Sequence, residues 1–194
     1  MGLGNILFGR KKLKDASGER LFAISTARIT LETELDLKPT GSAGVCFKAL
    51  SAGEFVRAEN EIQQLLESVA NESGSKIERR SDELGFEWIV VHDEDFEDLV
   101  ASVHLVASEL EARGFGPQLL AAVFPFESRG FDAKRIYWIY GFKQGTFWPF
   151  VPKGEGKDKE RDNAEELELK AKLEKELPVE PDLTRWFAIF DAPV

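Results

Sequence analysis

Four strand-like segments come in two closely spaced pairs, and this spacing constrains the fold more than any other feature of the sequence. In the first pair, the polar segment 76–80 precedes the strongly strand-forming segment 86–92 across five turn-forming residues. In the second pair, segments 135–142 and 146–151 flank a short loop whose Gly145 can adopt the left-handed conformation that such loops require. Strands joined by short loops run antiparallel, so the pattern favours an α+β fold over a doubly wound parallel sheet.

Apolar periodicity predicts three helices. The first begins at Ser51 and Glu54, which have capping-box spacing, and it carries one apolar stripe. The second covers residues 94–113, with acidic residues at its start and Arg-Gly at its end, as the helix dipole and the C-terminal glycine preference predict. The third follows Asn163, which resembles another cap together with Glu166. Its leucines recur every fourth residue, at Leu169, Leu173 and Leu177.

Other segments are read from weaker signals. Segment 25–37 fits strand alternation, whereas a serine at its start could cap a helix, so both interpretations stay open. Segment 118–124 is apolar on both faces and is predicted to be a central strand that Pro125 ends. Residues 152–162 are polar and mixed in charge, which predicts a solvated loop. Residues 183–190 are too apolar to stay in solvent, so we expect them to dock on the core.

These elements predict one α+β domain, an antiparallel sheet built from hairpins with three or more helices packed on it. The arrangement is reminiscent of type III secretion chaperones, small α+β modules that bind other chains, at the level of fold alone. The length of 194 residues suits a single domain. We expect residues 1–20 to form an N-terminal amphipathic segment and loop. Residues 21–194 then form the domain, with a docked C-terminal helix and tail.

Composition narrows the class of protein. The net charge of −10 disfavours nucleic-acid binding, which depends on a basic surface that neutralises phosphates. A single cysteine, Cys46, allows no intrachain disulfide and is typical of a reducing compartment. No apolar run reaches the roughly 18–20 residues that span a bilayer, and the basic residues near the N-terminus follow the apolar ones, unlike in a secretory signal. We therefore expect a cytoplasmic protein.

The N-terminal segment has two interpretations. An apolar face with lysines beyond it could form a helix that packs on the domain, or a weak anchor at the inner, anionic face of the membrane. We favour the first, because so few apolar residues give only marginal binding to a membrane surface. The candidate membrane contacts are Leu3, Ile6, Leu7, Phe8, Lys11 and Lys12.

Residues that could support catalysis or bind a metal are few. The two histidines, His92 and His104, stand in no catalytic motif, and Cys46 lies on a segment that reads as buried. The acidic residues at 93–98 lack the layout of a calcium loop, and capping of the helix that follows already explains them. We therefore predict no catalytic residues, no metal and no cofactor. The alternative is a small hydrolase or metal-dependent enzyme centred on His92.

The most distinctive feature is the aromatic content of the second hairpin. Alternation places some of these side chains in the core whichever way the sheet faces, and the others could form a surface for a protein partner. The candidate partner-binding residues are Tyr137, Trp138, Tyr140, Phe142, Phe147, Trp148 and Phe150.

Several motifs together resemble a known family, the PspA-associated protein PspAB family. They are the Met1-Gly-Leu start, Pro39-Thr-Gly41 with residues 43–48, residues 114–124, residues 145–150, and Arg161-Asp-Asn163 before the last helix. The resemblance covers nearly the whole chain, but its glycine and aromatic patterns identify a fold better than a reaction.

The resemblance implies a role beside PspA, the coiled-coil membrane-stress protein of the phage-shock system, and its companion PspAA. It carries over no catalytic residues. Our leading hypothesis is therefore a non-catalytic adaptor or regulator that binds PspA or one of its partners at the cytoplasmic face of the membrane. A dimeric, client-specific chaperone is a further alternative.

Overall fold

The fold is described by a computed structural model covering residues 18–48, 52–129, 134–154 and 158–194. Its helices are α2 (Ala23–Glu34), α3 (Ala52–Ser73), α4 (Phe96–Leu110) and α5 (Asn163–Leu173). Its longer strands are β2 (Ser42–Lys48), β3 (Lys76–Ser81), β4 (Phe86–His92), β5 (Leu119–Ser128), β6 (Arg135–Gly141) and β7 (Thr146–Phe150). Shorter strands are β1 (Leu37–Pro39), β8 (Pro152–Lys153) and β9 (Glu160–Arg161).

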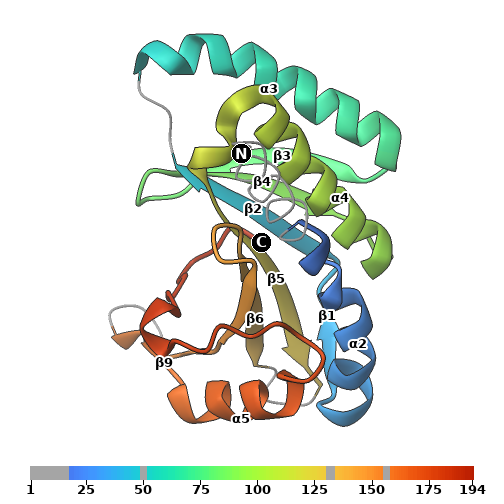
Figure 1. Cartoon of the computed structure of the whole chain (residues 1–194), viewed down its shortest axis with the longest axis vertical. Helices are drawn as coiled ribbons and strands as arrows, with labels where there is room; N and C mark the ends of the chain where they lie inside the picture. The colour runs from blue at the N-terminus through green and yellow to red at the C-terminus, as the bar shows by residue number, and fades with distance from the viewer. Residues whose placement is uncertain (1–17, 49–51, 130–133, 155–157) are drawn as a thin grey trace, which may run out of the picture.

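One large antiparallel sheet organises the chain (Figure 1). Its strands follow the order β3-β4-β2-β5-β6-β7, and the short β1 pairs with the far end of β5. The two predicted hairpins, β3–β4 and β6–β7, lie at opposite edges of the sheet. The predicted α+β class and hairpin-built sheet are therefore confirmed, whereas the comparison with secretion chaperones stays a prediction.

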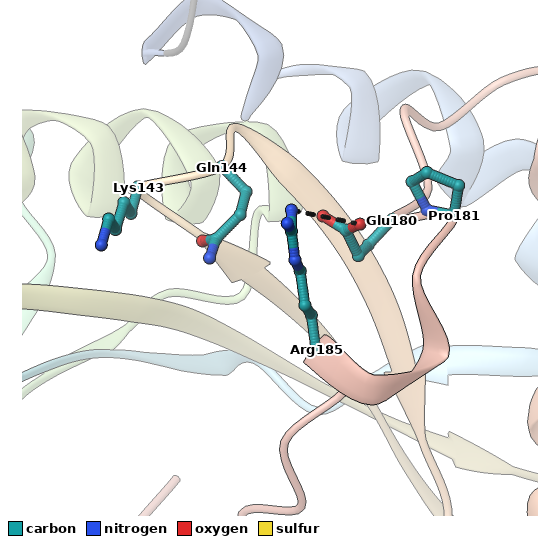
Figure 2. Close-up of a pocket in the computed structure, with 5 residues that line it drawn as sticks. All are labelled: Lys143, Gln144, Glu180, Pro181 and Arg185. Atoms are coloured by element: carbon teal, nitrogen blue, oxygen red, sulfur yellow. Dashed lines mark ion pairs between the residues drawn. The ribbon is translucent and has the colours of Figure 1, made fainter.

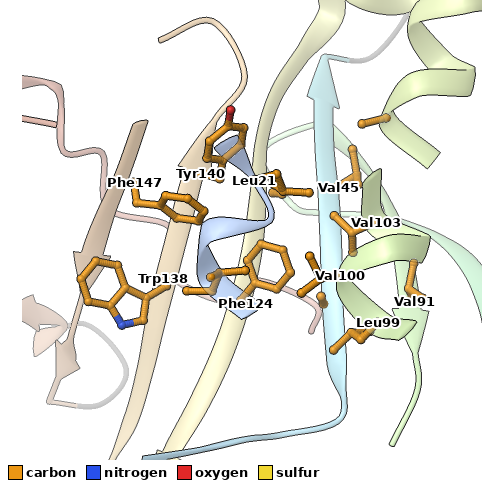
Figure 3. Close-up of a cluster of buried hydrophobic side chains, with 14 of the residues drawn as sticks. Leu21, Val45, Val91, Leu99, Val100, Val103, Phe124, Trp138, Tyr140 and Phe147 are labelled. Carbon is orange, nitrogen blue, oxygen red and sulfur yellow. The ribbon is translucent and has the colours of Figure 1, made fainter. Parts of the chain in front are cut away.

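Helices cover one face of the sheet. Helices α2 and α4 bury their apolar stripes against it, and α3 packs on α4. Figure 3 shows side chains of α4, of the sheet and of the turn before α2 that pack together in this layer. The labelled side chains are Leu21, Val45, Val91, Leu99, Val100, Val103, Phe124, Trp138, Tyr140 and Phe147. This layer is the main core, which leaves the opposite face of the sheet to be covered by other means.

The ambiguous segment 25–37 is mostly helical. Helix α2 buries Ile24, Ala27 and Leu31, at the three- and four-residue spacing of one helix face, and leaves Ile29 62% exposed. Strand alternation would have placed Ile29 and Leu31 on the same side. The helix begins after Phe22 without a side-chain cap, so Ser25, the residue that could have capped it, lies inside the first turn.

Helices α3 and α4 confirm the predictions from periodicity. Asp95 caps α4, because its side chain accepts hydrogen bonds from the backbone N–H groups of Glu97 and Asp98. Beyond the end of α4, Gly114 takes a φ of +91°, a conformation that glycine adopts without steric cost. Ser51, the predicted cap of α3, lies outside the described residues.

Strand β5 corrects the prediction that Pro125 ends it, since the strand continues to Ser128. A proline inside a sheet lacks the N–H that a neighbouring strand would accept. On the side where the carbonyl of Pro125 accepts from the backbone N–H of Thr40, β1 has ended and β2 has not yet begun. The missing donor therefore falls at a gap between two strands.

The region before α5 also differs from the prediction. Residues 152–162, predicted to be a loop, contain the two-stranded ribbon of β8 and β9. The cap of α5 is Asp162, whose side chain accepts from the N–H of Glu165, and Asn163 is the first helical residue. Glu166 does not complete a capping box, because its carboxylate is buried in a separate interaction described below.

Candidate functional site

The face of the sheet opposite α2 and α4 is covered by the C-terminal residues 178–194, here called the tail. The tail begins beside β7, where Phe147 donates its N–H to the carbonyl of Pro178 and accepts from the N–H of Glu180. It then passes through a short 3-10 turn at Leu183–Arg185 and crosses the sheet. Figure 1 shows it in red, running from α5 and ending near β2.

Trp186 anchors the first half of the tail. Its side chain is buried, and its indole N–H donates to the carbonyl of Glu180 at 3.0 Å. The backbone on either side is held by the body of the protein. The indole of Trp148 donates to the carbonyl of Phe187 at 3.0 Å, and Arg161 donates to the carbonyl of Trp186 at 2.6 Å.

The second half of the tail ends on β2. Val194 packs so closely on Gly44 that a Cβ at position 44 would lie 2.5 Å from the Val194 Cγ1 atom. Arg80 donates to the carbonyl of Pro193 at 3.3 Å, and Arg135 donates to the backbone oxygen of Val194 at 3.4 Å. The close approach of Val194 therefore requires a glycine at position 44.

The apolar surface beneath the tail is here called the tail-covered face. Its buried residues are Cys46, Trp88, Val90, Ala121, Val123, Tyr137, Ile139, Trp148 and Phe150. The tail contributes Trp186, Ile189, Phe190, Ala192 and Val194 to the same cluster. Phe190 meets the ring of Phe150 edge to face, with centroids 5.0 Å apart. The sheet is thus buried on both sides, by helices on one and by the tail on the other.

The seven aromatic residues predicted to bind a partner divide between these two faces. Tyr137, Trp148 and Phe150 belong to the tail-covered face, and each is at most 7% exposed. Trp138, Tyr140 and Phe147 are fully buried in the helix-covered core, and the partly buried Phe142 packs against it. The folded chain therefore presents none of the six buried side chains at its surface. A partner could contact the first three only where the tail is absent.

A buried ion pair between Arg161 and Glu166 lies next to the tail. The Glu166 side chain is 2% exposed, and its carboxylate accepts from the backbone N–H of Val151 at 3.0 Å and from Nε of Arg161 at 3.0 and 3.1 Å. The same guanidinium lies over the ring of Phe150, with 5.7 Å between Cζ and the ring centroid. Arg161 therefore links α5, β7 and the tail.

One surface cavity, beside the β6–β7 turn and the tail, has a volume of about 560 Å³ and is polar. Figure 2 shows Arg185 rising between Gln144 and Glu180. Both oxygens of Glu180 already accept hydrogen bonds, from Thr146 and from the N–H of Asp182. The guanidinium of Arg185 lies 3.9 Å from the carboxylate of Glu180, between Nη1 and Oε1, and 3.4 Å from that of Asp182, between Nε and Oδ2. Two cations, Lys143 and Arg185, and one carboxylate, Glu180, line this cavity.

A smaller cavity of about 110 Å³ lies between α5 and the 3-10 turn of the tail. Leu167 and Leu183 line it and are 46% and 49% exposed. Trp186 and the Arg161–Glu166 pair also line this cavity. This hollow is too small for an extended ligand, but it presents apolar side chains at the point where the tail leaves α5.

The two histidines lie in different surroundings. His92 is part-exposed, and its Nε2 lies 3.0 Å from the carboxylate of Glu78. His104 is half-buried against the ring of Phe22, and burial lowers its pKa. Cys46 pairs with Trp88 four residues along the strand from His92, a spacing of about 13 Å. Cys46 is therefore not a partner for the His92 imidazole.

Cys46 has the properties of a core thiol, as the sequence predicted. It is 4% exposed, and burial, with a smaller contribution from Asp82, raises its pKa to about 12. A thiol with so high a pKa stays protonated near neutral pH, and the thiolate is the reactive form.

The acidic residues at 93–98 cap α4 and orient the turn before it. Asp93 accepts from the hydroxyl of Ser75 at 2.7 Å and from the N–H of Asp95 at 2.9 Å. Ser75 in turn lies 2.9 Å from the buried hydroxyl of Ser102. Among the described residues, no group of three or more His, Cys, Asp or Glu side chains is arranged to hold a metal ion.

The candidate membrane contacts Leu3, Ile6, Leu7, Phe8, Lys11 and Lys12 lie outside the described residues. In the described ranges, no helix combines the length and the apolar character that crossing a bilayer requires.

These observations define a class: an α+β protein with a single large antiparallel sheet, covered by helices on one face and by its own C-terminal tail on the other. The particular family follows from sequence comparison. A family model described as PspA associated protein B matches residues 1–194, and the chain belongs to this family. No curated protein and no solved structure matches the chain significantly.

Proposed function

We propose that this chain is a non-catalytic adaptor that binds PspA in the membrane-stress response and acts by protein–protein contact. The observation that carries the proposal is the match of the PspA associated protein B family over residues 1–194, the entire sequence. A match of that extent concerns the whole folded unit, so the whole chain is the natural candidate for the associating module.

The surroundings of the chemically capable side chains support a role in binding over one in catalysis. Burial raises the pKa of the Cys46 thiol to about 12, which keeps the nucleophilic thiolate scarce at neutral pH. The partner that the structure shows for the imidazole of His92 is the carboxylate of Glu78 on a neighbouring strand, and neither surface cavity described above is lined by a histidine. General acid–base catalysis needs such a group within reach of a bound substrate.

The proposed adaptor acts in the cytoplasm, at the inner face of the membrane where PspA responds to stress. The acidic net charge of −10 disfavours direct adsorption of the whole chain to an anionic lipid surface, so contact through PspA is the simpler arrangement. PspAA is a second candidate partner within the same proposal.

Pull-down with purified components tests the proposal. The chain is immobilised and offered PspA or PspAA, each with and without anionic liposomes, and an unrelated acidic protein of similar size is the control. We expect PspA to be retained without liposomes and not by the control. Recovery of neither protein under any of these conditions would remove the proposal.

A further inference from the structure

The tail is attached to the sheet in the way that a bound peptide is attached to its receptor. From Phe187 onward, the hydrogen bonds that the structure shows between the tail backbone and the sheet come from side chains of Trp148, Arg80 and Arg135. The tail does not extend the sheet there as a further strand. Proteins that bind extended peptides commonly combine hydrogen bonds to the peptide backbone with apolar pockets for alternate peptide side chains.

The two halves of the tail are held unequally. The first half has the buried Trp186 and the short hydrogen bond from Arg161. The second half, residues 188–194, has two long hydrogen bonds from arginines whose side chains are 47% and 45% exposed, and an ion pair between Lys159 and the exposed Asp191. Exposed ion pairs contribute little to stability. Asp191 also takes a φ of +58°, which non-glycine residues seldom adopt.

The surface beneath residues 188–194 is aromatic and apolar. Phe190 covers Phe150, and Val194 covers Gly44 and the adjoining Trp88. Basic side chains of Arg80, Arg135 and Lys159 surround this half of the tail, although Arg80 and Arg135 each also pair with a glutamate. The surface therefore fits an apolar segment that carries an aromatic residue beside an acidic one, as Phe190-Asp191 does.

We propose that the tail-covered face is the docking surface for such a segment of PspA, and that residues 188–194 are its intramolecular competitor. The inference rests on the proposed function, because it names the surface through which the adaptor binds. Lifting residues 188–194 while Trp186 stays anchored uncovers Phe150 and Trp88 for the partner. The affinity for the partner is then reduced by the small fraction of molecules in which the tail has lifted.

A disulfide can hold the tail in place and test this directly. The 2.5 Å between a Cβ at position 44 and Cγ1 of Val194, plus one C–C bond of about 1.5 Å, places the two Cβ atoms within about 4.0 Å. Disulfides have Cβ–Cβ distances of about 3.5–4.5 Å. The locked variant is Gly44→Cys with Val194→Cys, built on Cys46→Ala so that only one pairing can form.

Affinity for purified PspA is measured by titration for four proteins. They are the full chain, a chain ending at Phe187, the locked variant oxidised and reduced, and Leu84→Ala, a control at a residue that is 81% exposed. We expect the shortened chain to bind at least about tenfold more tightly than the full chain. We expect the oxidised lock to bind at least tenfold more weakly than the same protein after reduction. Equal affinities for the shortened chain, the oxidised lock and the full chain would overturn the inference.

The native cysteine supplies a readout that does not depend on PspA. Cys46 is 4% exposed and belongs to the same apolar cluster as the tail residues, so we expect lifting of the tail to increase its access to a thiol reagent. We expect Cys46 to be labelled at least tenfold faster in the folded chain ending at Phe187 than in the full chain. Equal labelling rates would show that residues 188–194 do not cover the face and would overturn the inference. Binding of PspA to none of the proteins, with labelling as expected, would instead count against the proposed function.

Discussion

Replacement of the buried Glu166 by alanine is predicted to be among the most destabilising changes of a charged residue in α5. The carboxylate is 2% exposed and accepts hydrogen bonds from Val151 and Arg161. Its removal takes the charged partner from the guanidinium of Arg161 and the acceptor from the N–H of Val151, at a mostly buried site. Breaking a buried pair in this way typically costs about 3–5 kcal/mol. Because the Arg161 side chain is 24% exposed, we expect the lower end, about 3 kcal/mol.

Urea unfolding followed by tryptophan fluorescence measures this loss of unfolding free energy. The matched control is Glu168→Ala, an exposed position two residues along the same helix, where we expect a change within about 0.5 kcal/mol. The double variant Arg161→Ala with Glu166→Ala should lose less than the sum of the two single changes, because it leaves no unpaired charge. A loss below about 1 kcal/mol for Glu166→Ala would refute the view that this pair supports the fold.

Three further predictions follow from the structure. Between pH 9 and 10 the unfolding free energy should fall more steeply for the native chain than for Cys46→Ala, measured by urea unfolding at each pH. The unfolded thiol ionises near pH 9.0, whereas the folded thiol keeps its proton up to about pH 12, so rising pH favours the unfolded state. If the unfolding free energies of the two proteins fell with pH at the same slope, the burial of the thiol would be contradicted. Gly44→Ala should lower the unfolding free energy by about 1–3 kcal/mol in thermal or urea unfolding, because the new Cβ meets the Val194 side chain. Adding Val194→Gly should restore part of this loss. No restoration would argue against that contact. The Asp82 carboxylate accepts three hydrogen bonds in the β3–β4 turn. Asp82→Ala should therefore lower the unfolding free energy by about 1–3 kcal/mol, whereas Glu83→Ala should change it by no more than about 0.5 kcal/mol. Equal effects of the two variants in urea unfolding would count against this role of Asp82.

The elements that the sequence predicted well are those whose signal is local. Helix α4 has an apolar stripe, acidic residues at its start and a glycine after its end, and all three depend on residues within a few positions. The hairpin of β6 and β7 is likewise defined by its own turn, in which Gly145 takes a φ of +68°. Short-range periodicity and turn chemistry are sufficient for both.

The errors arose where a distant segment decides the outcome. A proline such as Pro125 is compatible with an interior strand only where the neighbouring strand is interrupted, and the gap between β1 and β2 is set some 80 residues earlier in the chain. Glu166 has capping-box spacing, but Arg161 on a neighbouring ribbon strand and the N–H of Val151 take its carboxylate. Neither neighbour is visible in a local pattern.

In the candidate site, too, features with a local signal were predicted, and features that depend on a distant segment were not. Alternation predicted that aromatic residues of the second hairpin would occupy both faces of the sheet, and they do. Docking of segment 183–190 on the core was also predicted, and the buried Trp186 confirms it. That the tail covers Tyr137, Trp148 and Phe150 could not be predicted, because an extended segment carries no periodic signal for the surface that it contacts. Arg161 and Gly44 were missed for the same reason.

Sedimentation velocity of the purified full chain with purified PspA shows whether the two proteins bind each other directly. We expect a faster-sedimenting species that contains both proteins, grows saturably with the concentration of this chain, and forms without lipid or any third protein. Two boundaries that sediment independently at every ratio, with PspA shown to be folded, would contradict it.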